Sequence, residues 1–532
     1  MSLRLKKQTV RMERILGEGR AETVAEGTVR LPERYPAVGR ALYVTAEPVV
    51  TAVEPTEDRV LIEGIIQLAL TYVAVEDEAP EDEGGTLRTR EELYRASWER
   101  ELSFAYLLEL VGATEESQVE VEAKVSGVSY EVRNDQATVD VDVVLDLAAR
   151  LADVTDVELT VGATGEEVEV DLDQVRIRQR LGAVETSGRI SAALPFGGRS
   201  VPERIVDVTA AASLAEVAEE EGETVIRGQI DCSALYMATE GAGAQCLEWP
   251  RGIGFALKAA PVGAGPQAVW APDVAVVVRD YYVETGAEGA ALRIDLDVTA
   301  KAVAYRTDVA AVVKDLSSEA AEVACRVEET EIYEAVGEGS TRTELQGVLE
   351  LPDGLPPIER LLRGDARFVV EEVHVLGDKV SVEGQVRVDL LYVGRGEEED
   401  EVHMARWPYA VAADFEVPVP GAEPGLDREV SAAVRRIDFD LINRETVEVR
   451  VQVACDARVG RMRVLENVVE AVAVPQEEED RPTFTFVITT EDDTLWKLAQ
   501  LYRTSVEAIL EQNEWIDPEK PLGKGRKVCI LR

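Results

Sequence analysis

The stretch K-V-S-V-E-G-Q-V-R-V-D-L-L-Y-V, Lys379–Val393, alternates apolar and polar side chains over most of its length. Val380, Val382 and Val386 fall on one side of an extended chain, and the charged residues fall on the other. Because successive side chains of a β-strand point to opposite faces, this alternation predicts a strand with one buried and one solvated face.

Two further copies of this pattern occur upstream, R-V-L-I-E-G-I-I-Q-L-A-L-T-Y-V (Arg59–Val73) and T-V-I-R-G-Q-I-D-C-S-A-L-Y-M (Thr224–Met237). In every copy a glycine precedes a tyrosine by eight positions. The marker pairs are Gly64 and Tyr72, Gly228 and Tyr236, and Gly384 and Tyr392. The glycines are 164 and 156 residues apart, which predicts a duplicated domain of about 160 residues rather than a short-period solenoid.

Other marks keep the same order around each copy. A Leu-Pro pair begins 33, 34 and 33 residues before the glycine, at Leu31, Leu194 and Leu351. A tryptophan follows the tyrosine, at positions 98, 249 and 407. The interior glycine is expected to mark a β-bulge or a close backbone approach, with contact to a ligand as the alternative.

The fold class predicted from these patterns is mainly β. Many alternating strands with one wet face favour antiparallel sheets, and we expect three sandwich-like domains at residues 1–157, 158–317 and 318–474. The segment P-Q-E-E-E-D-R-P is expected to be an acidic linker at 475–482. The alternating acidic residues are interpreted as a solvated face rather than calcium sites, because no D-x-[DN]-x-[DN]-G loop is present.

Composition excludes several classes of partner. A formal net charge of -47 disfavours binding to nucleic acid and to anionic membranes. No apolar run is long enough for membrane insertion or for a signal peptide, which predicts a cytoplasmic protein. Five scattered cysteines indicate neither a disulfide framework nor a zinc site, so no metal and no cofactor is expected.

No catalytic set of residues is apparent. The chain has two histidines, His374 and His403, and neither lies in a G-x-S-x-G or H-E-x-x-H motif. Both are interpreted as ordinary surface or rim residues. The sequence therefore predicts that the protein is not an enzyme.

The last fifty residues, 483–532, have a different pattern. Leu495, Leu498, Ala499 and Tyr502 recur at the spacing of one helix face, and a second helix follows between two short strands. Asp493 is the expected N-cap of the first helix, and Thr504 with Glu507 is the expected capping box of the second. The predicted order is strand, helix, helix, strand.

This tail resembles a LysM domain in its motifs D-T-L-W (493–496), S-V-E-A-I-L (505–510), Asn513 and L-G-K-G-R-K-V (522–528). The resemblance implies a groove for N-acetylglucosamine glycans between the loops 491–494 and 513–518. It departs from the family at Asp492, where glycine is usual, and at G-K-G, which replaces P-G-Q. The implied groove residues are Asp492, Asp493, Thr494, Asn513, Glu514, Trp515, Ile516 and Pro518.

Two tryptophans of the tail have alternative interpretations. Trp496 is expected either to pack in the small core or to stack on a sugar. Trp515 follows Asn513 and is expected either to contact a ligand or protein or to have no such role.

Three β-rich repeats followed by one LysM domain are similar to the SPOCS-domain proteins of endospore-forming bacteria, the SipL-like and SpoVID-like spore coat morphogenetic proteins. That resemblance implies a scaffold on the mother-cell side of the forespore surface. It also implies that the LysM domain docks to a coat basement-layer ATPase rather than to a glycan.

The expected function is thus a non-enzymatic assembly protein of the spore envelope, whose repeats bind further coat proteins or one another. The alternative is a cell-wall protein that binds peptidoglycan or N-acetylglucosamine and uses the repeats as a stalk or filament unit. An enzyme built on the repeats and targeted by the LysM domain is a third, less favoured alternative.

Overall fold

The computed structural model describes residues 3–77, 89–165, 168–239, 243–286, 289–318, 321–395, 400–474, 484–518 and 520–531. The linker expected at 475–482 lies outside these ranges. Within them the protein is mainly β, with two short helices near the C-terminal end. None of the helices in the described ranges is long and apolar enough to cross a membrane.

The strands that precede the C-terminal module form three sets of six that share one order of pairing. The first set is β1 (Arg4–Arg30), β2 (Arg40–Thr56), β3 (Arg59–Asp77), β4 (Thr89–Glu109), β5 (Val119–Val132) and β6 (Thr138–Thr164). The second set is β7 (Val168–Pro195), β8 (Pro202–Glu220), β9 (Glu223–Ala238), β10 (Ala244–Ala259), β11 (Val269–Gly286) and β12 (Gly289–Ser318). The third set is β13 (Glu322–Glu350), β14 (Ile358–Leu376), β15 (Lys379–Arg395), β16 (Asp400–Pro418), β17 (Asp427–Asn443) and β18 (Thr446–Val474).

Each set, here called a repeat, builds a sandwich of two antiparallel sheets. In the first repeat one sheet is β2-β3-β4 and the other is β1-β6-β5. The other repeats have the sheets β8-β9-β10 with β7-β12-β11, and β14-β15-β16 with β13-β18-β17. The quoted stretch is β15, the middle strand of its sheet, and its two copies are β3 and β9.

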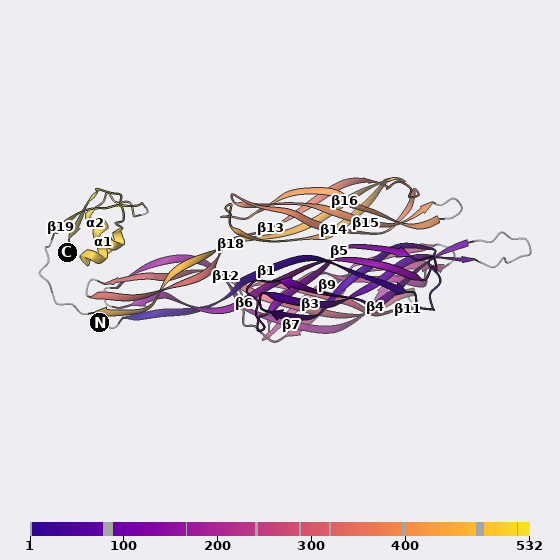
Figure 1. The fold of residues 1–532 in the computed structure, drawn as a ribbon, viewed down its shortest axis with the longest axis horizontal. Helices are drawn as coiled ribbons and strands as arrows, with labels where there is room; N and C mark the ends of the chain where they lie inside the picture. The colour runs from indigo at the N-terminus through magenta and orange to yellow at the C-terminus, as the bar shows by residue number, and fades with distance from the viewer. Residues whose placement is uncertain are drawn as a thin grey trace, which may run out of the picture.

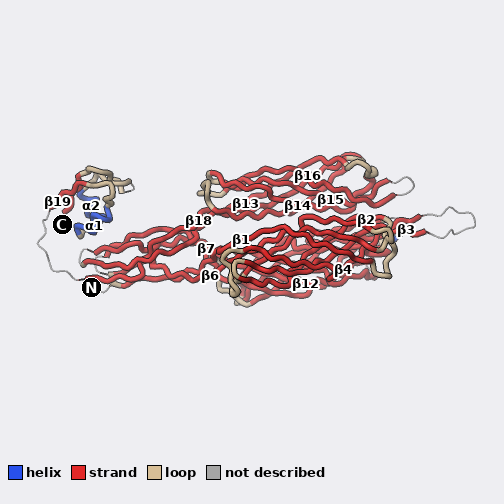
Figure 2. Tube along the Cα trace, viewed as in Figure 1, coloured by secondary structure: helices blue, strands red, loops and turns tan. Residues whose placement is uncertain are grey.

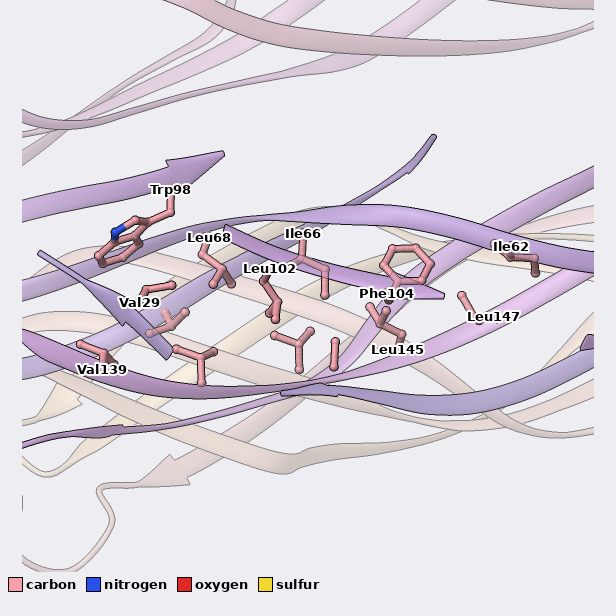
Figure 3. Packing of buried hydrophobic residues seen from close by; sticks show 14 of the residues in the cluster. Val29, Ile62, Ile66, Leu68, Trp98, Leu102, Phe104, Val139, Leu145 and Leu147 are labelled. Carbon is pink, nitrogen blue, oxygen red and sulfur yellow. The ribbon is translucent and has the colours of Figure 1, made fainter. Parts of the chain in front are cut away.

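Alternation along the strands creates the sandwich cores. On β6, Val139, Val141, Val143, Leu145 and Leu147 are all buried, and the acidic residues between them face outward. Figure 3 shows Val139, Leu145 and Leu147 of this row facing side chains of β3 and β4 across the gap between the sheets. The acidic alternation is therefore the solvated side of a sandwich, as expected from the period of two.

The marks recognised in the sequence are joined to one another by hydrogen bonds. The Trp98 indole N–H donates to the carbonyl of Arg30, next to Leu31, at 2.9 Å. Trp249 and Trp407 make the same kind of bond to the carbonyls of Pro195 and Glu350. These indoles attach the three-stranded sheet to the end of the long first strand of each repeat.

The marker tyrosines are fully buried, and their hydroxyl groups bind inside their own repeats. The Tyr72 hydroxyl donates to the Pro36 carbonyl at 2.8 Å, and the Tyr392 hydroxyl donates to the Pro356 carbonyl at 3.0 Å. The Tyr236 hydroxyl instead donates to Oε1 of Gln245. Burial raises the pKa of Tyr392 to about 12, so this hydroxyl keeps its proton.

Two of the marker glycines lie opposite irregularities in the neighbouring strand. The register of β2 shifts between Val50 and Ala52, across from Gly64. A Cβ at Gly64 would lie 2.6 Å from the Val49 carbonyl oxygen, and one at Gly384 would lie 2.4 Å from that of Val369. Both positions therefore require glycine because the backbone approaches closely.

Removing one marker hydroxyl has a predictable cost. Tyr392→Phe leaves the partly buried Pro356 carbonyl without its donor, so we expect the free energy of unfolding to fall by about 1–2 kcal/mol. Urea denaturation measures this change. Tyr409→Phe is the control, because that side chain is 75% exposed, and it should change the free energy by less than about 0.5 kcal/mol. Equal effects of the two substitutions would contradict the role given to the marker tyrosine.

The first and last strands of each repeat continue beyond the sandwich into a narrower stalk, visible in Figures 1 and 2. The pairing of β1 with β6 shifts between Ile15 and Gly17, and β7 and β13 have the same irregularity at Gly182 and Gly337. Beyond these glycines three two-stranded antiparallel ribbons, β1/β6, β7/β12 and β13/β18, pack on one another. The buried stalk core contains Val10, Met12, Leu159, Val175, Ile177, Val312, Ile332 and Leu465.

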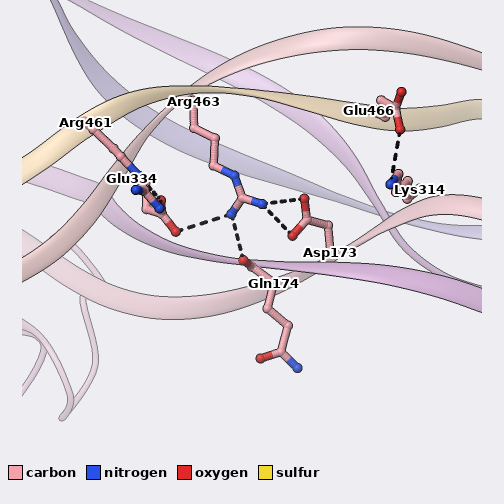
Figure 4. Close-up of polar contacts among 7 residues, drawn as sticks. All are labelled: Asp173, Gln174, Lys314, Glu334, Arg461, Arg463 and Glu466. Atoms are coloured by element: carbon pink, nitrogen blue, oxygen red, sulfur yellow. Dashed lines mark hydrogen bonds and ion pairs between the residues drawn. The ribbon is translucent and has the colours of Figure 1, made fainter. Parts of the chain in front are cut away.

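Polar contacts also join the two-stranded ribbons of the stalk. Nη2 of Arg463 on β18 donates to both carboxylate oxygens of Asp173 on β7, at 2.7 and 2.6 Å (Figure 4). It also donates to the Gln174 carbonyl and lies 3.4 Å from Glu334 on β13. One side chain of the third repeat thus attaches to the β7/β12 ribbon of the second repeat.

Candidate functional site

The C-terminal module has the predicted order of elements: β19 (Phe484–Ile488), α1 (Leu495–Tyr502), α2 (Val506–Gln512) and β20 (Lys527–Leu531). The two strands pair antiparallel, and the helices cover them. The buried core contains Leu498, Ala499, Ile509, Ile516, Leu522, Val528 and Ile530.

Both helix caps lie one residue later than expected. Thr494, not Asp493, is the N-cap of α1, and its hydroxyl accepts from the Lys497 amide at 3.1 Å. Ser505, not Thr504, is the N-cap of α2 and accepts from the Ala508 amide. Thr494 and Ser505 each have an extended backbone, which directs the hydroxyl group toward the amides of the first helical turn.

Asp493 makes a different hydrogen bond, within the loop that precedes α1. Its Oδ2 accepts a hydrogen bond from the Thr490 amide at 2.6 Å, and this bond lowers the pKa of the Asp493 carboxyl. The carboxylate therefore holds the loop that precedes α1 rather than the helix itself.

A cavity of about 960 Å³ opens between the loop before α1 and the loop after α2. Of the eight residues implied by the resemblance, Asp492, Asp493, Thr494 and Pro518 line it. Its remaining lining from the module is Glu491, Leu495, Trp496, Val506, Glu507, Leu510, Lys520, Pro521 and Leu522.

The other four implied residues lie elsewhere in the module. Asn513 is buried, and its side chain bonds to the Ile509 carbonyl and to both backbone groups of Cys529, which ties the end of α2 to β20. Ile516 is part of the core. Glu514 and Trp515 are exposed, and the Arg526 guanidinium lies 5.5 Å from the centre of the Trp515 ring.

One wall of the cavity comes from outside the module. Glu169, Val170 and Asp171 of β7, at the outer end of the stalk, face the groove loops. The Val506 amide at the start of α2 approaches Oε2 of Glu169 at 3.4 Å. Sequence reasoning missed this wall, because the two residues are 337 positions apart and no local pattern marks the contact.

Asp315 of β12 anchors the module to the stalk. Its Oδ2 accepts from the Trp496 indole N–H at 3.0 Å and from the side-chain Nε2 of Gln500 at 2.6 Å. Trp496 therefore bonds to the second repeat, an arrangement that neither sequence interpretation included. The contact holds the groove against β7.

The groove is strongly acidic. Six carboxylates line it, from Glu169, Asp171, Glu491, Asp492, Asp493 and Glu507, and Lys520 is the single cation among the described residues that line it. Burial raises the pKa of the Asp171 carboxyl, and the neighbouring Asp315 adds to this effect against the opposing charge of Lys314. An occupant with positive charge is favoured by this arrangement.

Comparison with known families identifies both parts of the chain. The family model of the SipL, SPOCS domain matches residues 37–133 and 357–442, and that of the LysM domain matches residues 488–530. The chain therefore contains both SPOCS-domain and LysM-domain matches, the combination of a SPOCS plus LysM protein. Among curated proteins and among solved structures, no significant match is found.

The SPOCS match covers β2–β5 of the first repeat and β14–β17 of the third. The second repeat has no matched residues but has the same strand order, the same sheets and its own marker pair, Gly228 and Tyr236. We therefore describe all three as SPOCS-type repeats on the basis of their topology.

A larger cavity of about 1,400 Å³ lies where the stalk meets the sandwiches. Among the described residues that line it, none is serine or cysteine, and its one histidine, His374, is exposed and contacts Glu372. His403, expected at the surface or at a rim, lies between the first and third repeats with its side chain 11% exposed, 3.1 Å from Arg40, and burial lowers its pKa. In the described ranges, no group of three or more His, Cys, Asp or Glu side chains is arranged to hold a metal ion.

Proposed function

We propose that the protein is a non-enzymatic scaffold of the spore envelope, in which the LysM domain docks to a protein of the coat basement layer. SPOCS domains associate the chain with sporulation, and LysM domains are associated with binding to peptidoglycan and other glycans. The protein would act on the mother-cell side of the forespore surface. The repeats of this scaffold are the strand sets β1–β6, β7–β12 and β13–β18, which begin and end near the boundaries expected at 1–157, 158–317 and 318–474.

The acidic groove completed by the stalk is the observation that carries this proposal. Glu169 and Asp171 narrow the LysM groove from one side and add to its negative charge. Peptidoglycan carries free carboxylates on its peptide stems, which such a groove repels, whereas a lysine- or arginine-rich segment of a protein is attracted. The repeats then supply the bulk of the scaffold, with exposed apolar side chains such as Val277, Tyr282 and Tyr409 available for contact with other coat proteins.

The alternative function is binding to peptidoglycan or N-acetylglucosamine, with the repeats as a stalk. It is favoured by the LysM fold and by Asp492, Asp493, Thr494 and Pro518, which line the groove at the positions that the resemblance implies. Calorimetric titration of an N-acetylglucosamine pentamer into the full chain separates the two functions. Saturable heat would favour the alternative.

Reversing charges in the groove tests the proposed docking. We expect Asp492→Lys combined with Glu507→Lys to weaken binding to purified coat basement-layer protein at least tenfold, because two attractive charges become repulsive. Biolayer interferometry with the full chain measures this affinity. Glu514→Lys is the matched control, since that residue is exposed and lies outside the groove. Unchanged binding by the double variant would contradict groove docking.

A further inference from the structure

The three sandwiches lie side by side (Figure 1), and residues from all three meet in one buried cluster. Each repeat contributes its three-stranded sheet. Equivalent positions supply Leu42, Val206 and Leu362 from the first strands, Val73, Met237 and Val393 from the middle strands, and Leu93, Ala244 and Val402 from the third strands. The cluster therefore has approximate threefold symmetry.

Three arginines at equivalent positions cross the boundaries between repeats. Arg40, Arg204 and Arg360 are 164 and 156 residues apart, the same steps as the marker glycines. The Arg40 guanidinium donates to the Val402 carbonyl at 2.8 Å, from the first repeat to the third. Arg204 donates to the Leu93 carbonyl at 2.9 Å, from the second to the first. Arg360 donates to the Ala244 carbonyl at 2.7 Å, from the third to the second.

These bonds close a ring. Every repeat gives one arginine to the next and receives one from the previous, so each boundary uses the same two patches. Two of these arginines also form ion pairs across their boundaries, Arg204 with Glu92 at 3.0 Å and Arg40 with Glu401 at 3.6 Å. Such a head-to-tail contact that closes after three steps is the interface of a cyclic trimer, here made within one chain.

Three residues at another equivalent position of the same strands break the symmetry. Tyr43, Asp207 and Arg363 occupy this position in the three repeats, opposite Thr71, Leu235 and Leu391. The Arg363 guanidinium donates to Asp207 Oδ2 and to the Tyr43 hydroxyl, both at 2.8 Å. Arg95 lies 3.3 Å from the other carboxylate oxygen of Asp207, whose side chain is only 3% exposed.

From this geometry we propose that one SPOCS-type repeat binds another through the surface formed by the arginine and the carbonyl that accepts its hydrogen bond. The Tyr43–Asp207–Arg363 triad then allows a ring with one copy of each repeat and disfavours a ring with two copies of the same repeat. A second copy of the third repeat in place of the second would bring two buried guanidinium groups together without a carboxylate. A second copy of the second repeat in place of the third would bring two buried carboxylates together beside the single Arg95 guanidinium. Both arrangements are strongly disfavoured, so the triad determines the specificity of assembly.

Cutting the chain between repeats tests this proposal on the whole protein. Protease sites are inserted at residues 165–167, between β6 and β7, and at residues 319–321, between β12 and β13. After cleavage, we expect the three fragments to elute together from a size-exclusion column at the mass of the uncut chain. Fragments that separate, or that form complexes with two copies of one repeat when two differently tagged samples are mixed, would overturn the proposal.

The triad is tested in the same cleaved protein. Arg363→Asp places two carboxylates together, and we expect its fragments to separate while each keeps its β-sheet circular dichroism signal. The matched control, Arg436→Asp, changes a 71% exposed side chain of the same repeat and should leave the fragments together. Fragments of Arg363→Asp that stay together as in the control would overturn the role of the triad.

Exchanging the two charges of the pair tests the proposal even if the Arg363→Asp variant fails to fold. The double variant Asp207→Arg with Arg363→Asp restores one buried pair of opposite charge across the same boundary. We expect its cleaved fragments to elute together again. They should be held more weakly than in the wild type, because Arg95 then faces the like charge introduced at position 207. Failure of the exchange to restore any association would overturn the proposal.

Discussion

Replacing Arg363 by alanine in the uncut chain is expected to lower the free energy of unfolding by about 3 kcal/mol. The substitution leaves the Asp207 carboxylate buried with Arg95 as its remaining ion pair, at 3.3 Å. It also removes the donor to the Tyr43 hydroxyl. Because all three repeats meet at this point, the loss weakens two boundaries at once.

The control for this prediction is Arg387→Ala. Arg387 also reaches from the third repeat to the first, where it donates to the Ser126 carbonyl at 3.0 Å, but its side chain is exposed. We expect a change of less than about 1 kcal/mol for this variant, as is usual for an exposed contact. Guanidinium denaturation of the full chain compares the two. A change at Arg363 no larger than at Arg387 would show that the buried triad adds nothing to stability.

Leu498→Asp in the LysM domain is expected to abolish recruitment of the protein to the forespore surface. Leu498 is 2% exposed in a core that the whole module shares. Burying an unpaired carboxylate there costs several kcal/mol, about as much as a module of this size has in total stability. The LysM domain therefore unfolds, while the repeats keep their own cores.

Leu501→Asp is the matched control, because Leu501 lies on the same helix and is 68% exposed. Fluorescent fusions imaged in sporulating cells report recruitment, and circular dichroism confirms that the repeats remain β-sheet. Normal recruitment of Leu498→Asp would mean that the repeats, and not the LysM domain, direct the protein to its place.

The sequence predicted those features that local patterns encode. Alternation in Lys379–Val393 and its copies identified the middle strands, and helical spacing of Leu495, Leu498 and Ala499 identified α1. Both N-caps were displaced by one residue, since neighbouring polar residues compete for the cap and backbone geometry decides between them. The length of the outer strands was not predicted, because strands of 27 to 30 residues pass through the bulges at Gly17, Gly182 and Gly337 without a break.

Contacts between distant parts of the chain were beyond prediction. Tyr43, Asp207 and Arg363 are equivalent in space but differ in type, so a search for repeated residues passes over them. The arginines at 40, 204 and 360 do repeat, but their partners are backbone carbonyls, which leave no signature in the sequence. The same holds for Asp315, whose role depends on where the stalk ends relative to α1.

The most direct test of the proposed function is a binding measurement between the full chain and purified coat basement-layer protein, in the presence and absence of an excess of N-acetylglucosamine pentamer. We predict saturable binding that the glycan does not reduce and that Leu498→Asp removes. Absence of binding to the protein, together with saturable binding of the glycan, would contradict the proposed docking and establish the LysM domain as a glycan-binding module.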